Sequence, residues 1–126
     1  MNEPVRDDEE LTAAIIECII KVHQVLGPGF EEFVYRNSLV IELSARNIAV
    51  EHEKEIAIRY EGHFVGKHRL DLLVDSRIVM ELKTVETLGR AHYAQIRSCL
   101  KAAGKRIGLL VNFSTAKADF RRVELD

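Results

Sequence analysis

The chain has 126 residues, a formal net charge of −2, and enough hydrophobic side chains, 47% of the total, to form one buried core. A chain of this length suits a single domain that needs no disulfide or metal to hold it together. No apolar run approaches the roughly 20 residues of a membrane-spanning helix, and residues 1–10 are acidic where a secretory signal would be basic and then apolar. The composition argues against a membrane or secreted protein and predicts a cytoplasmic one.

The charges are distributed unevenly along the chain. Residues 1–62 carry an excess of acidic side chains, whereas residues 63–126 carry an excess of basic ones. An acidic chain is not a general nucleic-acid binder, but a locally basic half is able to follow a phosphate backbone. The same charges also fit an ordinary solvated surface.

Several common site motifs are missing from the sequence. The two cysteines, Cys18 and Cys99, lie far apart in predicted helices, without a CxxC or Cys/His spacing. This predicts buried free thiols and argues against zinc. There is also no Gly-rich phosphate loop and no Ser-centred nucleophile elbow.

The amino-terminal part predicts two helices. Residues 1–10 are expected to be a disordered acidic tail, and residues 11–126 a single domain. Residues 11–26 carry apolar side chains at helical spacing, and Gly-Pro-Gly follows directly. Residues 31–45 predict a second helix that is apolar over much of its circumference, and therefore largely buried. His23 lies one position off the apolar stripe of the first helix, where a lone histidine is most often structural.

Polar residues at the start of the second helix are candidates for a pocket. Glu32 and Tyr35 are three residues apart, so they face the same way and are able to line one pocket. The alternative for Glu32 is a surface ion pair with Arg36, four residues later. Asn47 is expected to end the helix in the left-handed conformation.

The middle of the chain predicts three antiparallel strands. They span about residues 54–60, 64–74 and 77–84, and the alternation in the first predicts one buried face. We expect this meander to form the centre of the sheet.

The carboxyl-terminal part returns to helical spacing and then to strands. Residues 89–103 predict a helix with Gln95 and His92 beside its core stripe. Residues 106–113 form a continuous apolar run, typical of a parallel strand covered on both faces. Residues 120–125 predict a short edge strand with a basic pair.

Three charged residues stand on the two otherwise apolar strands of the predicted hairpin. They are Asp71, Glu81 and Lys83. Charges on such strands cost free energy unless they are paired or bind a metal, so their placement indicates a candidate site.

The length of the turn decides whether the two carboxylates meet. A two-residue turn at Asp75 and Ser76 sets Asp71 opposite Met80, which separates the carboxylates onto different faces. A three-residue turn at residues 75–77 sets Asp71 opposite Glu81 instead, because a one-residue slip flips every side chain. Asp75 and Ser76 are not residues that favour the positive φ of tight two-residue turns, which favours the longer turn.

Two neighbouring carboxylates beside a lysine make a site for a hard cation. Mg²⁺ prefers carboxylate and carbonyl oxygens, and polarises water for attack on a phosphoryl group. Lys83 is placed to orient or deprotonate that water and to stabilise the developing charge. Two structural alternatives remain, a surface Glu-Lys ladder and a buried ion-pair network.

The order of these features resembles a known family. Asp71 followed by Glu81-Leu82-Lys83 at the end of a meander, and then a helix with Gln95, is similar to the PD-(D/E)XK, or restriction-endonuclease-like, nuclease superfamily. Residues 29–35, GFEEFVY, resemble the signature of the narrower GxxExxY family, with Val-His and Leu-Gly-Pro-Gly before them. The resemblance runs from about residue 11 to residue 125. Leu70 stands where the superfamily pattern has proline.

The resemblance implies a fold and a site. The fold is an α/β, restriction-endonuclease-like αβββαβ core, with a mixed sheet flanked by helices and an extra amino-terminal helix. The implied ligands of Mg²⁺ or Mn²⁺ are Asp71, Glu81 and the Leu82 carbonyl, and Glu32 either reaches the metal through water or supports a second ion. Lys83 is the implied catalytic lysine, and Gln95 positions either the substrate or Lys83. His23 and Tyr35 match the narrower signature and are expected to line the pocket.

The implied function is hydrolysis of phosphodiester bonds in DNA or RNA by a metal-activated water. The alternative is a non-catalytic domain that binds nucleic acid or protein, because this fold also hosts members that bind without cutting. All five polar positions of the site are present here, which favours the nuclease. They are Glu32, Asp71, Glu81, Lys83 and Gln95. A site-specific cutter of this size needs a second subunit or partner, so we expect a homodimer.

Overall fold

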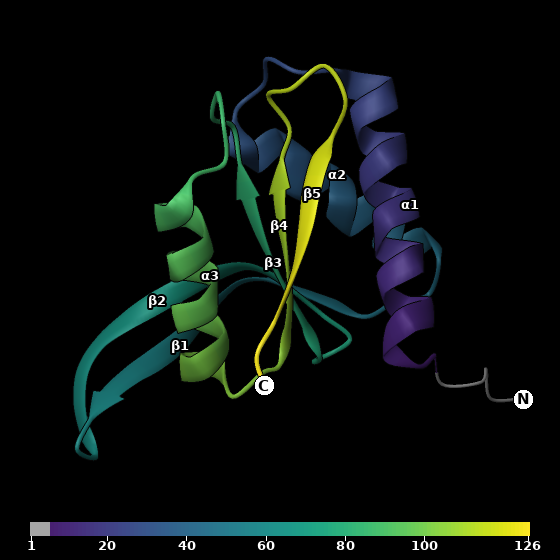
Figure 1. Cartoon of the computed structure of the whole chain (residues 1–126). Helices are drawn as coiled ribbons and strands as arrows, with labels where there is room; N and C mark the ends of the chain where they lie inside the picture. Colours follow the sequence, from purple (N-terminus) through teal and green to yellow (C-terminus); the bar gives the residue numbers. More distant parts are fainter. Residues whose placement is uncertain (1–5) are drawn as a thin grey trace, which may run out of the picture.

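The computed structural model describes residues 6–126, which form three helices and five strands (Figure 1). In chain order they are α1 (Asp8–Leu26), α2 (Glu32–Ala45), β1 (Val50–Tyr60), β2 (His63–Val74), β3 (Ile78–Lys83), α3 (Arg90–Ala103), β4 (Ile107–Asn112) and β5 (Asp119–Glu124). The strands form one sheet in the order β1-β2-β3-β4-β5, in which only the β3–β4 pair is parallel. This is the predicted mixed sheet with an αβββαβ core and an extra helix, α1.

The first helix starts earlier than the sequence predicts. Asp7 caps it by accepting a hydrogen bond from the Glu10 N–H at 2.8 Å. The acidic residues 8–10, expected in a disordered tail, form its first turn, where negative charge suits the positive end of the helix dipole. Residues 1–5 of the expected tail lie outside the described residues. Gly27, with φ of 69°, ends the helix as predicted.

The second helix is less buried than predicted. Only Tyr35, Leu39 and Leu43 are buried, whereas Phe33 is 49% exposed and Ile41 is 68% exposed. One stripe of α2 packs on α1 and the sheet, with Val40 partly buried against it, whereas Phe33 and Ile41 face outward. Asn47 follows it with φ of 59°, as expected for a left-handed cap.

The β1–β2 hairpin extends beyond the helices, and its tip projects from the molecule (Figure 1). In β1 only Val50 and Ile56 are partly buried. The predicted buried face and the predicted central position of β1 are therefore wrong, since β1 is an edge strand. The centre of the sheet is formed by β3 and β4, and β4 is buried throughout, as its apolar run predicts.

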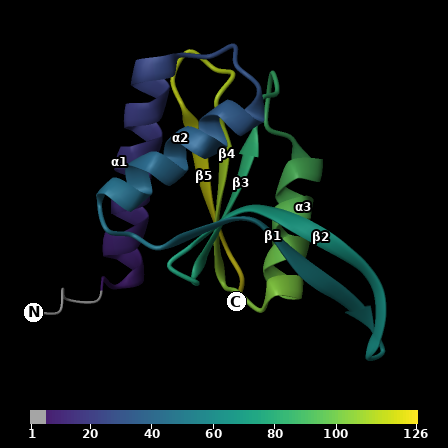
Figure 2. The same ribbon diagram turned by 180° about the vertical axis from the view of Figure 1, so that it is seen from behind.

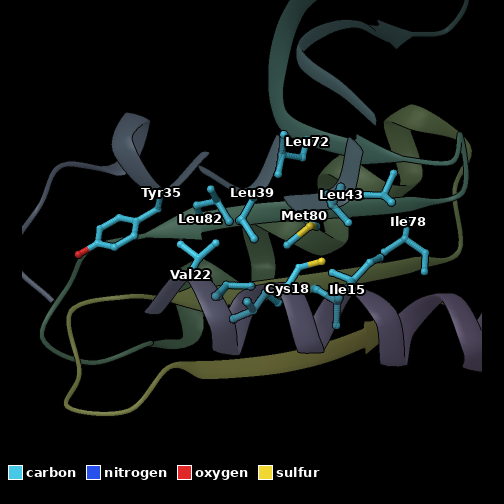
Figure 3. Packing of buried hydrophobic residues seen from close by; sticks show 14 of the residues in the cluster. Ile15, Cys18, Val22, Tyr35, Leu39, Leu43, Leu72, Ile78, Met80 and Leu82 are labelled. Carbon is cyan, nitrogen blue, oxygen red and sulfur yellow. The ribbon is translucent and has the colours of Figure 1, made fainter. Parts of the chain in front are cut away.

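Two hydrophobic clusters pack on opposite faces of the sheet. Helices α1 and α2 cover one face (Figure 2), and their cluster includes Cys18, Tyr35, Leu39, Met80 and Leu82 (Figure 3). Helix α3 covers the other face, and its cluster includes Val79, Ile96, Cys99 and Leu100. Because side chains alternate along β3, Glu81 and Lys83 share the α3 side with Val79. Within residues 6–126, no helix is both long and apolar enough to cross a bilayer.

Candidate functional site

The β2–β3 connection sets the register on which the candidate site depends. It pairs Val74 with Ile78, Leu73 with Val79 and Leu72 with Met80. The connection is therefore three residues long, as predicted, and the register projects Asp71 toward the position opposite Glu81.

The conformation of this connection differs from the sequence prediction. Asp75 and Ser76 adopt φ angles of 52° and 55°, and the Arg77 N–H donates to the Val74 carbonyl at 3.0 Å, as in a type I′ turn. The prediction that these two residues avoid positive φ is wrong, because short polar side chains tolerate the left-handed region. Arg77 also holds the turn through Asp75 Oδ2 at 2.7 Å.

The site lies where β2 and β3 separate. Their ladder ends at the Leu72–Met80 pair, and beyond it Asp71 Oδ2 accepts the Leu82 N–H at 2.7 Å. A side-chain carboxylate thus replaces a backbone acceptor of the ladder. This contact fixes Asp71 beside the last residues of β3.

Glu81 is a buried acid with an unfavourable charge. It is only 4% exposed, and its Oε1 has no hydrogen-bond partner among the described residues. Burial and the neighbouring Asp71 raise the pKa of Glu81 to about 8, and Lys83 lowers it by less than these two effects raise it. Neutralisation by Lys83 is therefore incomplete, which argues against a balanced ion-pair network. A cation would relieve the repulsion between the two acids.

Lys83 and Gln95 meet at the open edge of the site. Lys83 Nζ donates to Gln95 Oε1 at 2.9 Å, which links the end of β3 to α3. The amide oxygen orients the ammonium group without removing its charge. These two predicted site residues are therefore in direct contact.

Glu32 reaches the same cluster from the start of α2. Burial and the charge of Asp71 raise its pKa, whereas Lys83 and a hydrogen bond from the Thr84 backbone lower it. Its predicted surface partner, Arg36, instead lies 3.2 Å from Glu53. The structure therefore brings Glu32 to the acids of the sheet.

The backbone of β3 offers a further oxygen. The Phe113 N–H donates to the Lys83 carbonyl at 3.0 Å, so that carbonyl points toward β4. Successive carbonyls of a strand point to opposite edges, which directs the Leu82 carbonyl toward the side where β2 has separated. The Leu82 side chain itself is buried in the cluster with α1 and α2.

His23 and Tyr35 contact loops rather than the acids. His23 Nε2 lies 2.9 Å from the Thr115 carbonyl, and the Tyr35 hydroxyl donates to the Gly27 carbonyl at 2.6 Å. Both rings stack on Phe113. His23 also lines a cavity of about 570 Å³ between the end of α1 and residues 116–120. The predicted pocket-lining role of these two residues in the reaction stays a prediction.

Two residues that the sequence does not single out also contact Glu81. His68 Nε2 lies 3.6 Å from Glu81 Oε1, and Cys99 of α3 is a neighbour whose pKa is raised to about 12 by burial and by Glu81. Cys99 follows Gln95 by four residues, so helical spacing places them on one face. His68 gives no such signal, because strict alternation puts it on the opposite face from Asp71.

A bend in β2 explains the position of His68. Leu70 and Leu73 both belong to the cluster under α3, although an odd spacing separates them. The faces of β2 therefore exchange between these residues, where the strand leaves β3. This exchange turns His68 toward Glu81.

A cavity of about 420 Å³ opens beside Asp71. It is lined by Arg36, Glu53, Glu55, Lys67, His68, Arg69 and Asp71. The basic side chains are partly neutralised, since Glu53 lies 3.2 Å from Arg36 and Glu55 lies 3.5 Å from Lys67. The cavity gives solvent access to Asp71, whereas Glu81 stays buried.

The donor atoms at this edge fit a hard divalent cation. Asp71 is held at the end of β3 beside Glu81, the Glu32 carboxyl is close enough for the charge of Asp71 to raise its pKa, and the Leu82 carbonyl points the same way. Magnesium prefers such oxygen ligands. The unpartnered, buried oxygen of Glu81 is the observation that speaks for a ligand.

The fold of this chain is similar to that of a solved structure. A search of curated proteins gives no match. The crystal structure of SSO0001 gives a TM-score of 0.58 at 23% identity, covering 75% of this chain and 50% of that chain. This chain thus spans half the length of SSO0001, and at this identity the likeness concerns the fold.

A second crystal structure, that of an alkaline exonuclease (LHK-Exo) from Laribacter hongkongensis, gives a TM-score of 0.42 at 14% identity, covering 98% of this chain and 73% of that chain. The family model described as the PD-(D/E)XK nuclease superfamily matches residues 9–123, nearly the whole chain. The chain therefore belongs to the PD-(D/E)XK nuclease superfamily.

Proposed function

We propose that this protein is a metal-dependent nuclease that hydrolyses phosphodiester bonds of DNA or RNA. The observation that carries the proposal is the buried carboxyl of Glu81, held against the acid Asp71 and beside Lys83. Stability alone does not explain a buried carboxyl held against a second acid, because their repulsion opposes folding. Membership of a nuclease superfamily supports the same function.

We assign Mg²⁺, or Mn²⁺, to Asp71, Glu81, the Leu82 carbonyl and Glu32. When bound, this cation would neutralise charge on the phosphoryl group and lower the pKa of a water molecule. Glu81 gives up its carboxyl proton to act as a ligand, because only the ionised carboxylate binds a cation well.

Lys83 acts on the substrate side of the site. Its ammonium group, oriented by Gln95 at 2.9 Å, donates to a phosphoryl oxygen and stabilises the charge that develops there. Arg36, Lys67 and Arg69 line the cavity beside Asp71 and attract the phosphate backbone, with part of their charge offset by Glu53 and Glu55.

The narrower family and the roles of His23 and Tyr35 are proposed from the sequence. Residues 29–35 support membership of the GxxExxY family, in which His23 and Tyr35 belong to the signature. Tyr35 fixes the loop before α2 through the Gly27 carbonyl, and this loop leads directly to Glu32. A cytoplasmic location and a homodimer stay predictions.

The test is cleavage of labelled single-stranded and double-stranded DNA and RNA by the purified protein, with Mg²⁺ or Mn²⁺ and with EDTA. We expect metal-dependent cleavage that falls about 10²- to 10³-fold in Lys83→Ala and Glu81→Ala, the loss typical of removing one transition-state contact. Lys101→Ala, which alters an exposed lysine of α3, is the matched control and keeps full activity.

Two outcomes would contradict the proposal. Equal cleavage by wild type, Lys83→Ala and Glu81→Ala would assign the activity to a contaminating nuclease. Binding of nucleic acid by wild type without cleavage of any substrate, with either metal, would instead support a non-catalytic binding domain.

A further inference from the structure

We propose that His68, Glu81 and Cys99 form a second metal site, for zinc, which shares Glu81 with the acidic site. The three residues come from β2, β3 and α3, and each offers one ligand atom. These ligand atoms all lie within 4.8 Å of one another. The cluster therefore has the size of a metal site before any ion binds.

The distances are close to those of zinc coordination. Zinc is bound tetrahedrally at about 2.0 to 2.3 Å from nitrogen, oxygen and sulfur, which sets neighbouring ligand atoms roughly 3.2 to 3.7 Å apart. His68 Nε2 and Glu81 Oε1 are 3.6 Å apart. Small rotations of the three side chains, of about an ångström at the ligand atoms, complete the geometry.

Two of the three ligand atoms lack a partner. Glu81 Oε1 and His68 Nε2 are buried, and neither has a hydrogen-bond partner among residues 6–126. Their separation of 3.6 Å is too long for a hydrogen bond. Buried polar atoms are almost always satisfied, so two unsatisfied atoms facing each other point to an absent ligand between them.

The mixed donor set selects the ion. A thiolate, an imidazole and a carboxylate suit zinc, whereas magnesium takes oxygen ligands and does not favour sulfur. The Cys99 thiol releases its proton to solvent when its sulfur binds, and neutral His68 binds through Nε2. Three protein ligands leave a fourth position for water.

Sharing Glu81 makes the two sites antagonistic. Zinc draws the Glu81 carboxylate toward His68 and Cys99, away from Asp71 and the Leu82 carbonyl. Zinc occupancy therefore weakens magnesium binding and inhibits cleavage. The inhibition rests on the proposed nuclease function, whereas zinc binding does not.

The first test uses Co²⁺ as a spectroscopic substitute for Zn²⁺, added to metal-free protein. Wild type is expected to bind one Co²⁺ and to show a thiolate-to-metal charge-transfer band. Added Zn²⁺ should displace the Co²⁺ and abolish the band. Cys99→Ser loses the band, and His68→Asn binds at least about tenfold more weakly, since loss of even a supporting partner has an effect of that size.

Matched controls use the residues outside the cluster. Cys18→Ala removes the other buried thiol, His52→Asn removes an exposed histidine of β1, and both keep the band. Circular dichroism checks that each variant folds, and His68→Asn, at a partly exposed position, tests the site if Cys99→Ser does not fold. A wild type without the band, or a band that survives in folded Cys99→Ser or His68→Asn, overturns the proposal.

A second test separates this inference from the proposed function. Zn²⁺ is expected to inhibit Mg²⁺-dependent cleavage by wild type but to inhibit Cys99→Ser at least tenfold less, while Asp71→Asn keeps the Co²⁺ band and loses cleavage. Zinc binding without any cleavage would refute the nuclease and leave the zinc site standing. Cleavage with equal zinc inhibition in wild type and Cys99→Ser would refute the zinc site's effect and leave the nuclease.

Discussion

At the scale of single residues, Glu81 makes the stability of the metal-free protein depend on pH. Folding raises its pKa from 4.5 to about 8. An acid with a raised pKa stabilises the fold while it is protonated, and this contribution is lost as the pH rises through the folded value. We expect the free energy of unfolding to fall between about pH 4.5 and 8, by at most about 1.4 kcal/mol per pH unit. Urea unfolding in EDTA at several pH values measures it.

The variant Glu81→Gln isolates this effect, because glutamine resembles the protonated acid and does not ionise. Above pH 8 we expect it to be more stable than wild type by roughly 1 to 3 kcal/mol, since burying an unpaired charge is costly. Glu86→Gln, at an exposed acid shortly after β3, is the control and follows wild type. If Glu81→Gln and wild type show the same pH dependence of the free energy of unfolding, ionisation of Glu81 does not destabilise the fold.

At the scale of elements, the β2–β3 connection holds a residue in an unfavourable backbone conformation. This connection also joins the two strands in the register on which the site depends. Ser76 has φ of 55°, where glycine is favoured. Ser76→Gly is therefore expected to raise the free energy of unfolding by about 0.5 to 1 kcal/mol, and Ser76→Val to lower it by at least about 1 kcal/mol. The same change in a helix, Ser98→Gly, should destabilise the protein by about 0.5 kcal/mol. Stabilisation by Ser98→Gly and not by Ser76→Gly would contradict this account.

Register was predictable only as a choice between two pairings, and the exposure of the elements was not predictable. Strand β3 carries apolar side chains on both faces, so a one-residue slip still buries them, and only the need for Asp71 and Glu81 to share a face favoured the pairing of Val74 with Ile78. Alternation in β1 looks the same whether its apolar face meets a helix or solvent, and here Tyr60 is 69% exposed. The change of face in β2 that brings His68 to Glu81 was not predictable, because it interrupts the alternation of side chains on which a strand prediction depends.

At the scale of the whole molecule, the fold was predictable because each element carries a separate signal. The buried run of β4 indicates a parallel neighbour, and the break at Gly27 separates two helices. The candidate site was predictable only as a set of residues. Glu32 and Gln95 come from helices on opposite faces of the sheet, and only the packing of both helices shows that they meet the end of β3.

Because the acids of the site come from α2, β2 and β3, cation binding should stabilise the whole fold. A ligand that binds only the folded state contributes about 2.7 kcal/mol at a concentration 100 times its Kd. We expect saturating Mg²⁺ at pH 8 to raise the Tm of wild type by roughly 5 °C or more. Differential scanning calorimetry measures the shift, which Asp71→Asn should lose and Cys99→Ser should keep. An equal shift in Asp71→Asn would mean that magnesium stabilises the protein elsewhere, and the acids at the end of β3 would then not be its site.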